Sequence, residues 1–365
     1  MWSLSHQPGL DVEPDERKAG VVSDAVDTAA TYDAAEELMD RRTPIQRLQS
    51  LLHQLPWISP MVVLLICVVV FGFLNSNFVK PGALSTIMAQ TAVVGALAIG
   101  QGLIVLTAGI DLSVGAIMIF ASMVMAKTAF ENHLPGWLSL LLGIAVGIGA
   151  GLINGLLITR AKLPPFIVTL GTLGVFTSAT LIYATGREVR NNELDPLLLQ
   201  LGDGFKIGSF QITYGVLVMV ALYALFAYIL RFTAWGRHVY AVGDDPDAAR
   251  LAGIEVDRVL LSVYGVAGLI YGIGAWVLIG RVGSAGPNAG EGVNLDTITA
   301  VVIGGLSLFG GRGRIVGALI GGLIVSAVGL GLTLAQLDPS YKVGAIGLLI
   351  IGAVTADQWI RRARA

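Results

Sequence analysis

Long apolar stretches separated by short polar connections run from about residue 57 to the end of this sequence. A stretch of roughly 20 apolar residues is long enough for a helix to cross the hydrocarbon core of a membrane. The pattern therefore predicts an all-α polytopic membrane protein with about ten transmembrane helices. The predicted spans are 57–74, 85–107, 112–127, 137–158, 165–184, 212–230, 259–280, 295–310, 315–335 and 341–358.

The composition agrees with a membrane protein. Of the 365 residues, 55% are hydrophobic and only 13% are charged, whereas soluble domains carry about 25% charged residues. The 47 glycines are typical of closely packed transmembrane helices. Cys67 is the only cysteine, which excludes an intrachain disulfide and a cysteine-based zinc site.

The N-terminal region differs from the rest of the chain. Ten acidic residues lie between Asp11 and Asp40, against only Arg17 and Lys18, and the segment lacks the apolar region of a signal peptide. We expect residues 1–42 to be a disordered acidic tail in the cytoplasm. Residues 43–365 are then the transmembrane domain.

The positive charges in the connections predict the orientation. An even number of spans places both termini on one side, and Lys and Arg are enriched in cytoplasmic connections. With both termini in the cytoplasm, fourteen Lys and Arg residues lie inside and seven outside, not counting Arg17 and Lys18 of the tail. The predicted topology is multi-pass, with both termini in the cytoplasm. The topology around 107–113 stays open between a cytoplasmic turn and an unwound stretch within the membrane.

Glycines recur at helical spacing in two spans, where they let helix backbones approach closely. A pore-lining role is the alternative, but helix packing is favoured because such spacing is common in polytopic proteins. There is also a faint similarity between residues 92–118 and 298–324, both rich in glycine. The first stripe consists of Gly143, Gly147, Gly151 and Gly155, and the second of Gly313, Gly317, Gly321 and Gly329.

The sequence offers no catalytic or metal site. The four histidines are isolated, no HExxH pattern occurs, and no G-x-x-x-x-G-K-[ST] loop is present to bind ATP. We therefore predict a protein that is not an enzyme and has no cofactor. If ATP drives it, a separate ATPase subunit must bind the nucleotide.

Few polar residues lie within the apolar spans. Asp111 is the acid most closely flanked by apolar residues, and buried charges in membranes are usually functional. It is either a capping or turn residue before the next helix, which Ser113 could also cap, or a residue of the translocation pathway. The candidate pathway residues are Gln101, Asp111, Ser113, Asn154 and Thr172, and interhelical hydrogen bonding is the alternative for the uncharged ones.

The connection at 233–257 has the most informative local pattern. Gly243 and the residues up to Pro246 predict a turn, with Pro246 at the first position of a short helix. Gly253 would end that helix. A short helix that projects from the membrane is suited to docking into a groove of a partner protein, whereas it is too short and weakly apolar for membrane anchoring.

At these residues the sequence resembles the permease family of ribose, xylose, galactose and fructose ABC importers. The run GRHVYAVGDDPDAARLAGI (236–254) is similar to the family's coupling segment, which contacts the ATPase subunit. Three further stretches resemble family motifs in the same order: TAGIDLSVGAIM (107–118), NGLLITRAKLPPFIVTLGTL (154–173) and VVIGGLSLFGGRGRIVGALIGGLI (301–324).

The resemblance implies a permease subunit that imports a monosaccharide similar to ribose, fructose or xylose, and it implies a location in a bacterial inner membrane. Its implied partners are an ABC ATPase subunit, an extracytoplasmic sugar-binding protein and a second permease chain. An ion-coupled secondary sugar transporter is the alternative, against which the scarcity of buried acids counts. The residues to which the resemblance assigns ATPase coupling are Gly236, Arg237, Gly243, Asp244, Pro246, Ala248, Ala249 and Gly253.

Overall fold

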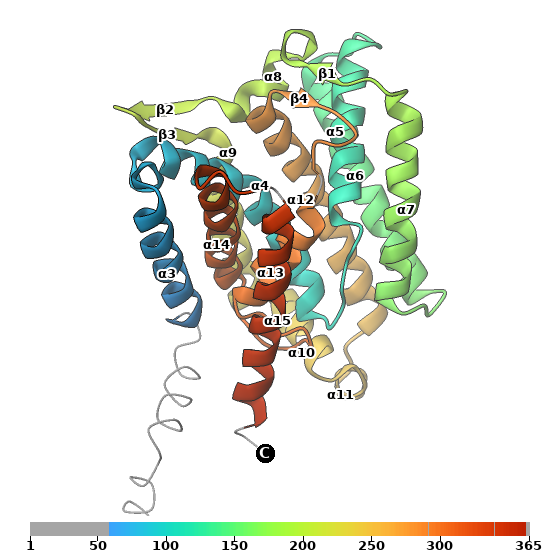
Figure 1. Cartoon of the computed structure of the whole chain (residues 1–365). Coiled ribbons are helices and arrows are strands. Elements are labelled where there is room, and N and C mark those ends of the chain that lie inside the picture. Colours follow the sequence, from blue (N-terminus) through green and yellow to red (C-terminus); the bar gives the residue numbers. More distant parts are fainter. Residues whose placement is uncertain (1–57, 291, 339, 363–365) are drawn as a thin grey trace, which may run out of the picture. The chain divides into compact units, whose positions relative to one another are not determined.

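The computed structural model describes residues 58–290, 292–338 and 340–362. The predicted acidic tail at 1–42 lies outside the described residues. Each of the ten predicted apolar ranges corresponds to one helix of the described part (Figure 1). These helices are α3 (Ile58–Leu74), α4 (Pro81–Leu106), α5 (Val114–Phe130), α6 (Gly136–Thr159), α7 (Pro165–Ala184), α9 (Tyr214–Phe232), α12 (Val256–Val282), α13 (Val293–Ile303), α14 (Ile315–Leu334) and α15 (Ser340–Arg362).

Six of these helices are long and apolar enough to cross a membrane, namely α4, α6, α7, α9, α12 and α14. The other four have shorter apolar segments of 10–17 residues. The multi-pass helical fold is therefore confirmed, and ten crossings stay a prediction.

The remaining elements lie in the connections. At the end of the bundle drawn uppermost in Figure 1 lie β1 (Val189–Arg190), α8 (Pro196–Leu199), β2 (Gly204–Ile207), β3 (Phe210–Thr213) and β4 (Ser284–Ala285). Strand β1 pairs antiparallel with β4, and β2 with β3. The 3₁₀ helices are η1 (Ser76–Val79), η2 (Asn191–Glu193) and η3 (Gln200–Gly202).

Two helices lie at the opposite end of the bundle, α10 (Ala234–Asp244) and α11 (Pro246–Leu251). Helix α3 begins at this end, and α15 ends there (Figure 1). The two ends of the described bundle therefore lie on the same side as α10 and α11.

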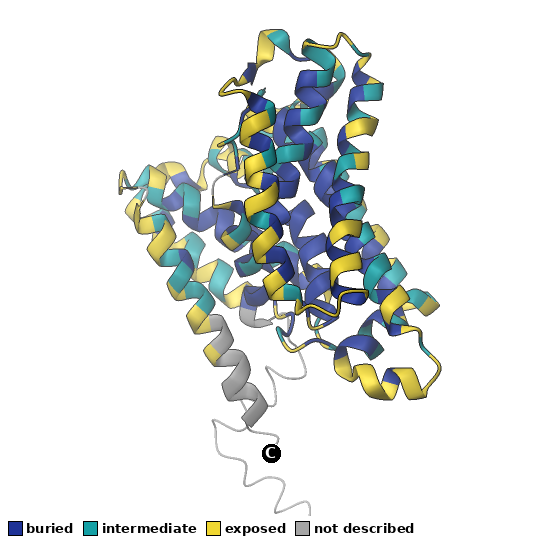
Figure 2. Cartoon of the chain, turned by 90° about the vertical axis from the view of Figure 1, so that its right-hand side faces the viewer, coloured by how far each residue is buried: buried dark blue, intermediate teal, exposed yellow. Residues whose placement is uncertain are grey.

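Helix α4 is the most buried of the six long helices, and α7 is the least buried. Helices α4, α5, α12 and α14 pack in the interior, while the outer helices expose large apolar side chains (Figure 2). Exposed apolar faces are what a surrounding bilayer requires.

The glycine stripe of α6 packs against α12 and α5. A Cβ atom at Gly147 would overlap the Gly268 carbonyl of α12, and one at Gly151 the Tyr264 carbonyl, so the two helices can approach closely only without these side chains. On α14, Gly317 and Gly321 lie in the same way against α13. The packing interpretation is confirmed for the first stripe and for Gly317 and Gly321 of the second. Gly313 lies in the loop before α14, and a Cβ atom at Gly329 would meet only the Lys342 side chain, at 3.4 Å.

The prediction of a helix over 295–310 is wrong at its C-terminal end. Helix α13 ends at Ile303, and residues 304–314 form a loop in which Gly305, Gly310, Gly311 and Gly313 have positive φ angles. The segment remained apolar beyond Ile303, which concealed the break. Glycine adopts this backbone region without steric cost.

The segment 107–113 is a break between α4 and α5. Ala108 has a φ of 59°, and α4 ends where the Ala108 N–H donates to the Val105 carbonyl and the Gly109 N–H donates to the Ile104 carbonyl. Asp111 then lies beside Gln101, more than one helical turn back from the end of α4. The stretch is thus unwound and folds back along α4, and the choice between a cytoplasmic position and one within the membrane stays a prediction.

Candidate functional site

The connection at 233–257 contains two helices rather than one. Thr233 caps α10, its Oγ1 accepting a hydrogen bond of 3.1 Å from the Gly236 N–H. The helix continues through Gly243 to Asp244. The predicted turn at Gly243 is therefore wrong, because the chain turns only at Asp245, whose φ of −155° and ψ of 104° are extended.

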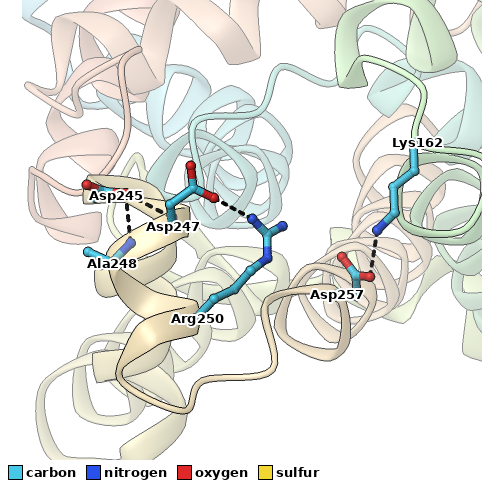
Figure 3. A network of polar contacts seen from close by, with 6 residues as sticks. All are labelled: Lys162, Asp245, Asp247, Ala248, Arg250 and Asp257. Carbon is cyan, nitrogen blue, oxygen red and sulfur yellow. Dashed lines mark hydrogen bonds and ion pairs between the residues drawn. The ribbon is translucent and has the colours of Figure 1, made fainter.

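The predicted short helix is α11, and its start and end are confirmed. Asp245 caps it, because its Oδ1 accepts hydrogen bonds from the N–H groups of Asp247 and Ala248, at 2.9 and 3.0 Å (Figure 3). Pro246 is the first helical residue. Gly253, with a φ of 83°, ends the unit.

The eight predicted coupling residues fall into two groups. Three are buried within the chain and have no surface to offer a partner: Gly236, Gly243 and Ala249. Five are exposed at this end of the bundle: Arg237, Asp244, Pro246, Ala248 and Gly253. We call the five exposed residues the docking surface, after the role that the resemblance predicts for them, and the three buried residues pack beneath it.

Leu251 is a candidate that the sequence reasoning did not select. It is 92% exposed at the last position of α11, where a large apolar side chain gains nothing from water. The signal in the sequence was a single leucine on an otherwise polar and small-residue helix.

Two ion pairs, each between a basic and an acidic side chain, lie on and beside α11. Arg250 Nη1 lies 2.7 Å from Asp247 Oδ1, and Lys162 Nζ lies 2.7 Å from Asp257 Oδ2 (Figure 3). Both pairs are exposed, and such pairs contribute only about 0–1 kcal/mol to stability. Their effect is on the shape and charge of the surface, which carries alternating positive and negative groups.

Under the docking surface, α10 contacts two distant parts of the chain. A Cβ atom at Gly243 would overlap the Leu106 carbonyl at the end of α4. The Tyr240 hydroxyl donates a 2.8 Å hydrogen bond to the Gly313 carbonyl of the 304–314 loop. Burial raises the pKa of Tyr240, an effect that the nearby Arg314 charge partly offsets.

A second group of polar residues surrounds the break between α4 and α5. Asp111 Oδ1 accepts hydrogen bonds from the Ser113 N–H and hydroxyl, at 2.7 and 2.5 Å. Asp111 Oδ2 accepts one of 3.2 Å from the Tyr271 hydroxyl of α12. Asn154 of α6 donates to Ser113 Oγ at 2.9 Å. Helices α4, α5, α6 and α12 thus meet at one buried turn.

Gln101 joins the same cluster through the backbone of Asp111. With its amide nitrogen facing the Asp111 carbonyl, it donates at 3.0 Å and accepts from the Asp111 N–H at 3.3 Å. Thr169 of α7, which the sequence did not indicate, donates to the Ile110 carbonyl at 3.0 Å. Thr172 is buried one helical turn beyond Thr169, and its hydroxyl donates to the Thr169 carbonyl of the same helix.

Four of the five candidate pathway residues therefore lie together: Gln101, Asp111, Ser113 and Asn154. Within the part of the chain that the structure describes, two buried oxygens of this region have no hydrogen-bond partner, Asn154 Oδ1 and the Tyr264 hydroxyl. An unpartnered buried polar group is unfavourable. The cluster accordingly has unused capacity to bind a hydroxyl group or water.

Residues 83–354 match the protein family described as the permease component of the branched-chain amino acid transport system. The chain belongs to this permease family. It is 45% identical over 357 residues to the fructose import permease protein of Rhizobium meliloti, covering 97% of this chain and 98% of that protein. The resemblance to sugar-import permeases that the motifs indicated is confirmed.

Two further relatives cover most of both chains. The permease is 38% identical over 301 residues to the ribose import permease protein of Bacillus subtilis, which spans 82% of this chain and 92% of the relative. It is 33% identical over 314 residues to the galactose/methyl galactoside import permease protein of Escherichia coli, which covers 81% of this chain and 92% of that protein. All three relatives are import permeases, so this chain is a membrane transport subunit.

Proposed function

We propose that this permease imports a monosaccharide, with fructose as the first candidate, in a complex driven by separate ATPase subunits. Fructose is preferred because the similarity to the fructose import permease extends over nearly the full length of both chains. Ribose and galactose are the next candidates, on the names of the other relatives.

The observation that carries the proposal is the construction of α11. A helix of six residues has little stability of its own, yet this one has a carboxylate cap, a proline start and a glycine end. It presents Ala248 and the 92% exposed Leu251. A rigid small helix with an apolar tip is suited to a groove on a partner protein, which we infer to be the ATPase subunit.

The proposed topology follows from the position of α11. If α11 meets a cytoplasmic ATPase, then the beginning of α3 and the end of α15, which lie at the same end of the bundle (Figure 1), are cytoplasmic as well. The ten apolar helices then cross a bacterial inner membrane, the shorter ones in part. We further propose that two permease chains form the translocation unit, to which an extracytoplasmic binding protein delivers the sugar.

For the five candidate pathway residues we propose a path that opens only when the protein changes conformation. Gln101, Asp111, Ser113, Asn154 and Thr172 are all buried by the chain itself. A sugar would reach them after the break between α4 and α5 has moved. Their hydroxyl, amide and carboxylate groups are of the kind that sugar hydroxyls bind.

The test is uptake of radiolabelled fructose, ribose and galactose into cells that carry the native permease or Ala248→Glu. The matched control is Ala161→Glu, which adds the same charge at another exposed position in the connection between α6 and α7. Membrane insertion and co-purification of the ATPase subunit are measured for each variant. We expect Ala248→Glu to lose uptake and the ATPase at least tenfold, while Ala161→Glu keeps both.

Two results would contradict the proposal. Uptake that is unchanged by Ala248→Glu would show that α11 does not dock. Uptake that a protonophore abolishes while cellular ATP is maintained would instead identify an ion-coupled carrier.

A further inference from the structure

Three segments that are far apart in the sequence meet directly beneath the docking surface. They are the end of α4 at Leu106, the end of α10 at Gly243, and the 304–314 loop at Gly310 and Gly311. We refer to this contact of Leu106, Gly243, Gly310 and Gly311 as the glycine junction. It lies next to Asp245, the residue that caps α11.

The junction is packed backbone to backbone. The Gly311 N–H donates a 3.0 Å hydrogen bond to the Leu106 carbonyl, which also contacts Gly243. A Cβ atom at Gly310 would overlap the Gly243 carbonyl. A Cβ atom at Gly311 would lie 2.7 Å from the Cα of Asp244. The three segments cannot shift past one another at these contacts, because no flexible side chain separates their backbones.

The loop side of the junction is held in place by its own bonds. The Ser307 N–H donates to the Arg312 carbonyl at 3.1 Å, and the Gly310 N–H donates to the Ser307 carbonyl at 3.0 Å. Tyr240 adds its 2.8 Å bond from α10 to Gly313. The loop and α10 are thus joined by the hydrogen bond between Tyr240 and Gly313 and by the packing of Gly310 and Gly311 against Gly243 and Asp244.

The α4 side of the junction leads within five residues to Asp111. Thr107 and Ala108 are bonded to the last carbonyls of α4, and Asp111 is bonded to Gln101 of that helix. Asp111 in turn accepts from Tyr271 of α12. A displacement of Leu106 is therefore passed to the turn that holds the buried polar cluster.

We infer that the glycine junction positions the break between α4 and α5 according to the position of the docking surface. Gly311 is then a positioning residue for transport, and α10 and the 304–314 loop move as one unit. This inference rests on the proposed function, since it supposes that an ATPase subunit displaces α11.

The first test replaces Gly311 by Ala and compares it with Gly208→Ala. The two glycines have nearly the same backbone strain, with φ angles of 65° and 64°, but Gly208 has no neighbouring atom within 4 Å. ATP hydrolysis is measured on the purified permease–ATPase complex, and radiolabelled fructose uptake on the same cells. We expect Gly311→Ala to keep ATP hydrolysis but to transport at least tenfold less sugar per ATP, and Gly208→Ala to match the native ratio.

A purely structural role for Gly311 would lower hydrolysis and uptake in the same proportion, and that outcome would overturn the inference. An unchanged ratio of sugar to ATP in Gly311→Ala would also overturn it, although the proposed function would stand. If the native permease shows no ATP-dependent uptake, the proposed function itself fails.

A second test does not depend on the folding of a glycine variant. Asp244 and Arg312 form an exposed ion pair of 3.8 Å between α10 and the loop. Asp244→Cys and Arg312→Cys are combined in a Cys67→Ser background, and transport is compared only after mass spectrometry has confirmed that oxidation forms the disulfide. If α10 and the loop move as one unit, the oxidised and reduced forms transport sugar at the same rate. Inhibition on oxidation that a reductant reverses would show that they must separate, and would overturn the inference.

Discussion

Asp111 allows a direct test of whether a buried carboxylate holds a turn or acts on the transported solute. Its two oxygens accept three hydrogen bonds, two from Ser113 and one from Tyr271. Replacement by Ala leaves three buried donors without an acceptor, and each costs about 1–3 kcal/mol. Allowing for relaxation, we expect a loss of about 3–6 kcal/mol, which is a large part of the stability of a typical domain.

Replacement of Asp111 by Asn should cost far less. The amide oxygen can still accept from both donors of Ser113, and the amide nitrogen can donate to the Tyr271 hydroxyl oxygen. We expect a loss of about 1 kcal/mol, the net worth of one hydrogen bond.

The assay combines unfolding of the detergent-solubilised protein with uptake of labelled sugar. If Asp111 holds the turn, the Ala variant is strongly destabilised, whereas the Asn variant folds and retains most of its uptake. An Asn variant that is as stable as the native protein but has lost tenfold or more in uptake would show that the charge acts on the pathway. A fully stable Ala variant would refute the hydrogen-bond reasoning as a whole.

Two more predictions concern packing and charge inside the bundle. Gly151→Leu should force α6 away from the Tyr264 carbonyl of α12 and cost about 3 kcal/mol or more by overpacking, whereas Gly149→Leu, which faces open space, should unfold like the native protein in detergent. Lys342→Met should leave the buried Asp296 carboxylate without its partner at 2.9 Å and cost about 3 kcal/mol. Adding Asp296→Asn should restore the unfolding midpoint, and a failure to do so would exclude a charge effect.

The positions of the apolar helices could be predicted from sequence because each is a long run of one residue class. The predicted range 165–184 coincides with α7, and 315–335 differs from α14 by one residue. Helix α10 was missed for a physical reason. Gly236 and Gly243 weaken an isolated helix by about 1 kcal/mol each, and here both glycines are required by close contacts with α9 and α4.

The chemistry around Asp111 was only half visible in the sequence. A polar residue within an apolar run can be recognised by itself, and this is how Gln101 and Asn154 were found. Their meeting with Tyr271 could not be foreseen, because 160 residues separate it from Asp111 and no local pattern encodes such a contact. The same holds for Gly311 and Leu106. Long-range packing decided both sites.

The faint similarity between residues 92–118 and 298–324 has a counterpart in the structure. Each segment contains an apolar helix, a glycine-containing break and the start of another helix, and both breaks lie against the end of α10. A break in a membrane helix exposes backbone groups that lipid cannot satisfy.

Here one break supplies the donor, the Gly311 N–H, and the other supplies the acceptor, the Leu106 carbonyl. The free-energy cost of the two breaks is therefore lower when they lie side by side than it would be if they were apart. Separating them would leave the Gly311 N–H and the Leu106 carbonyl without this hydrogen bond. The same hydrogen bond that makes the breaks tolerable thus favours their moving together, which is the property that a transmitting element beneath a docking helix requires.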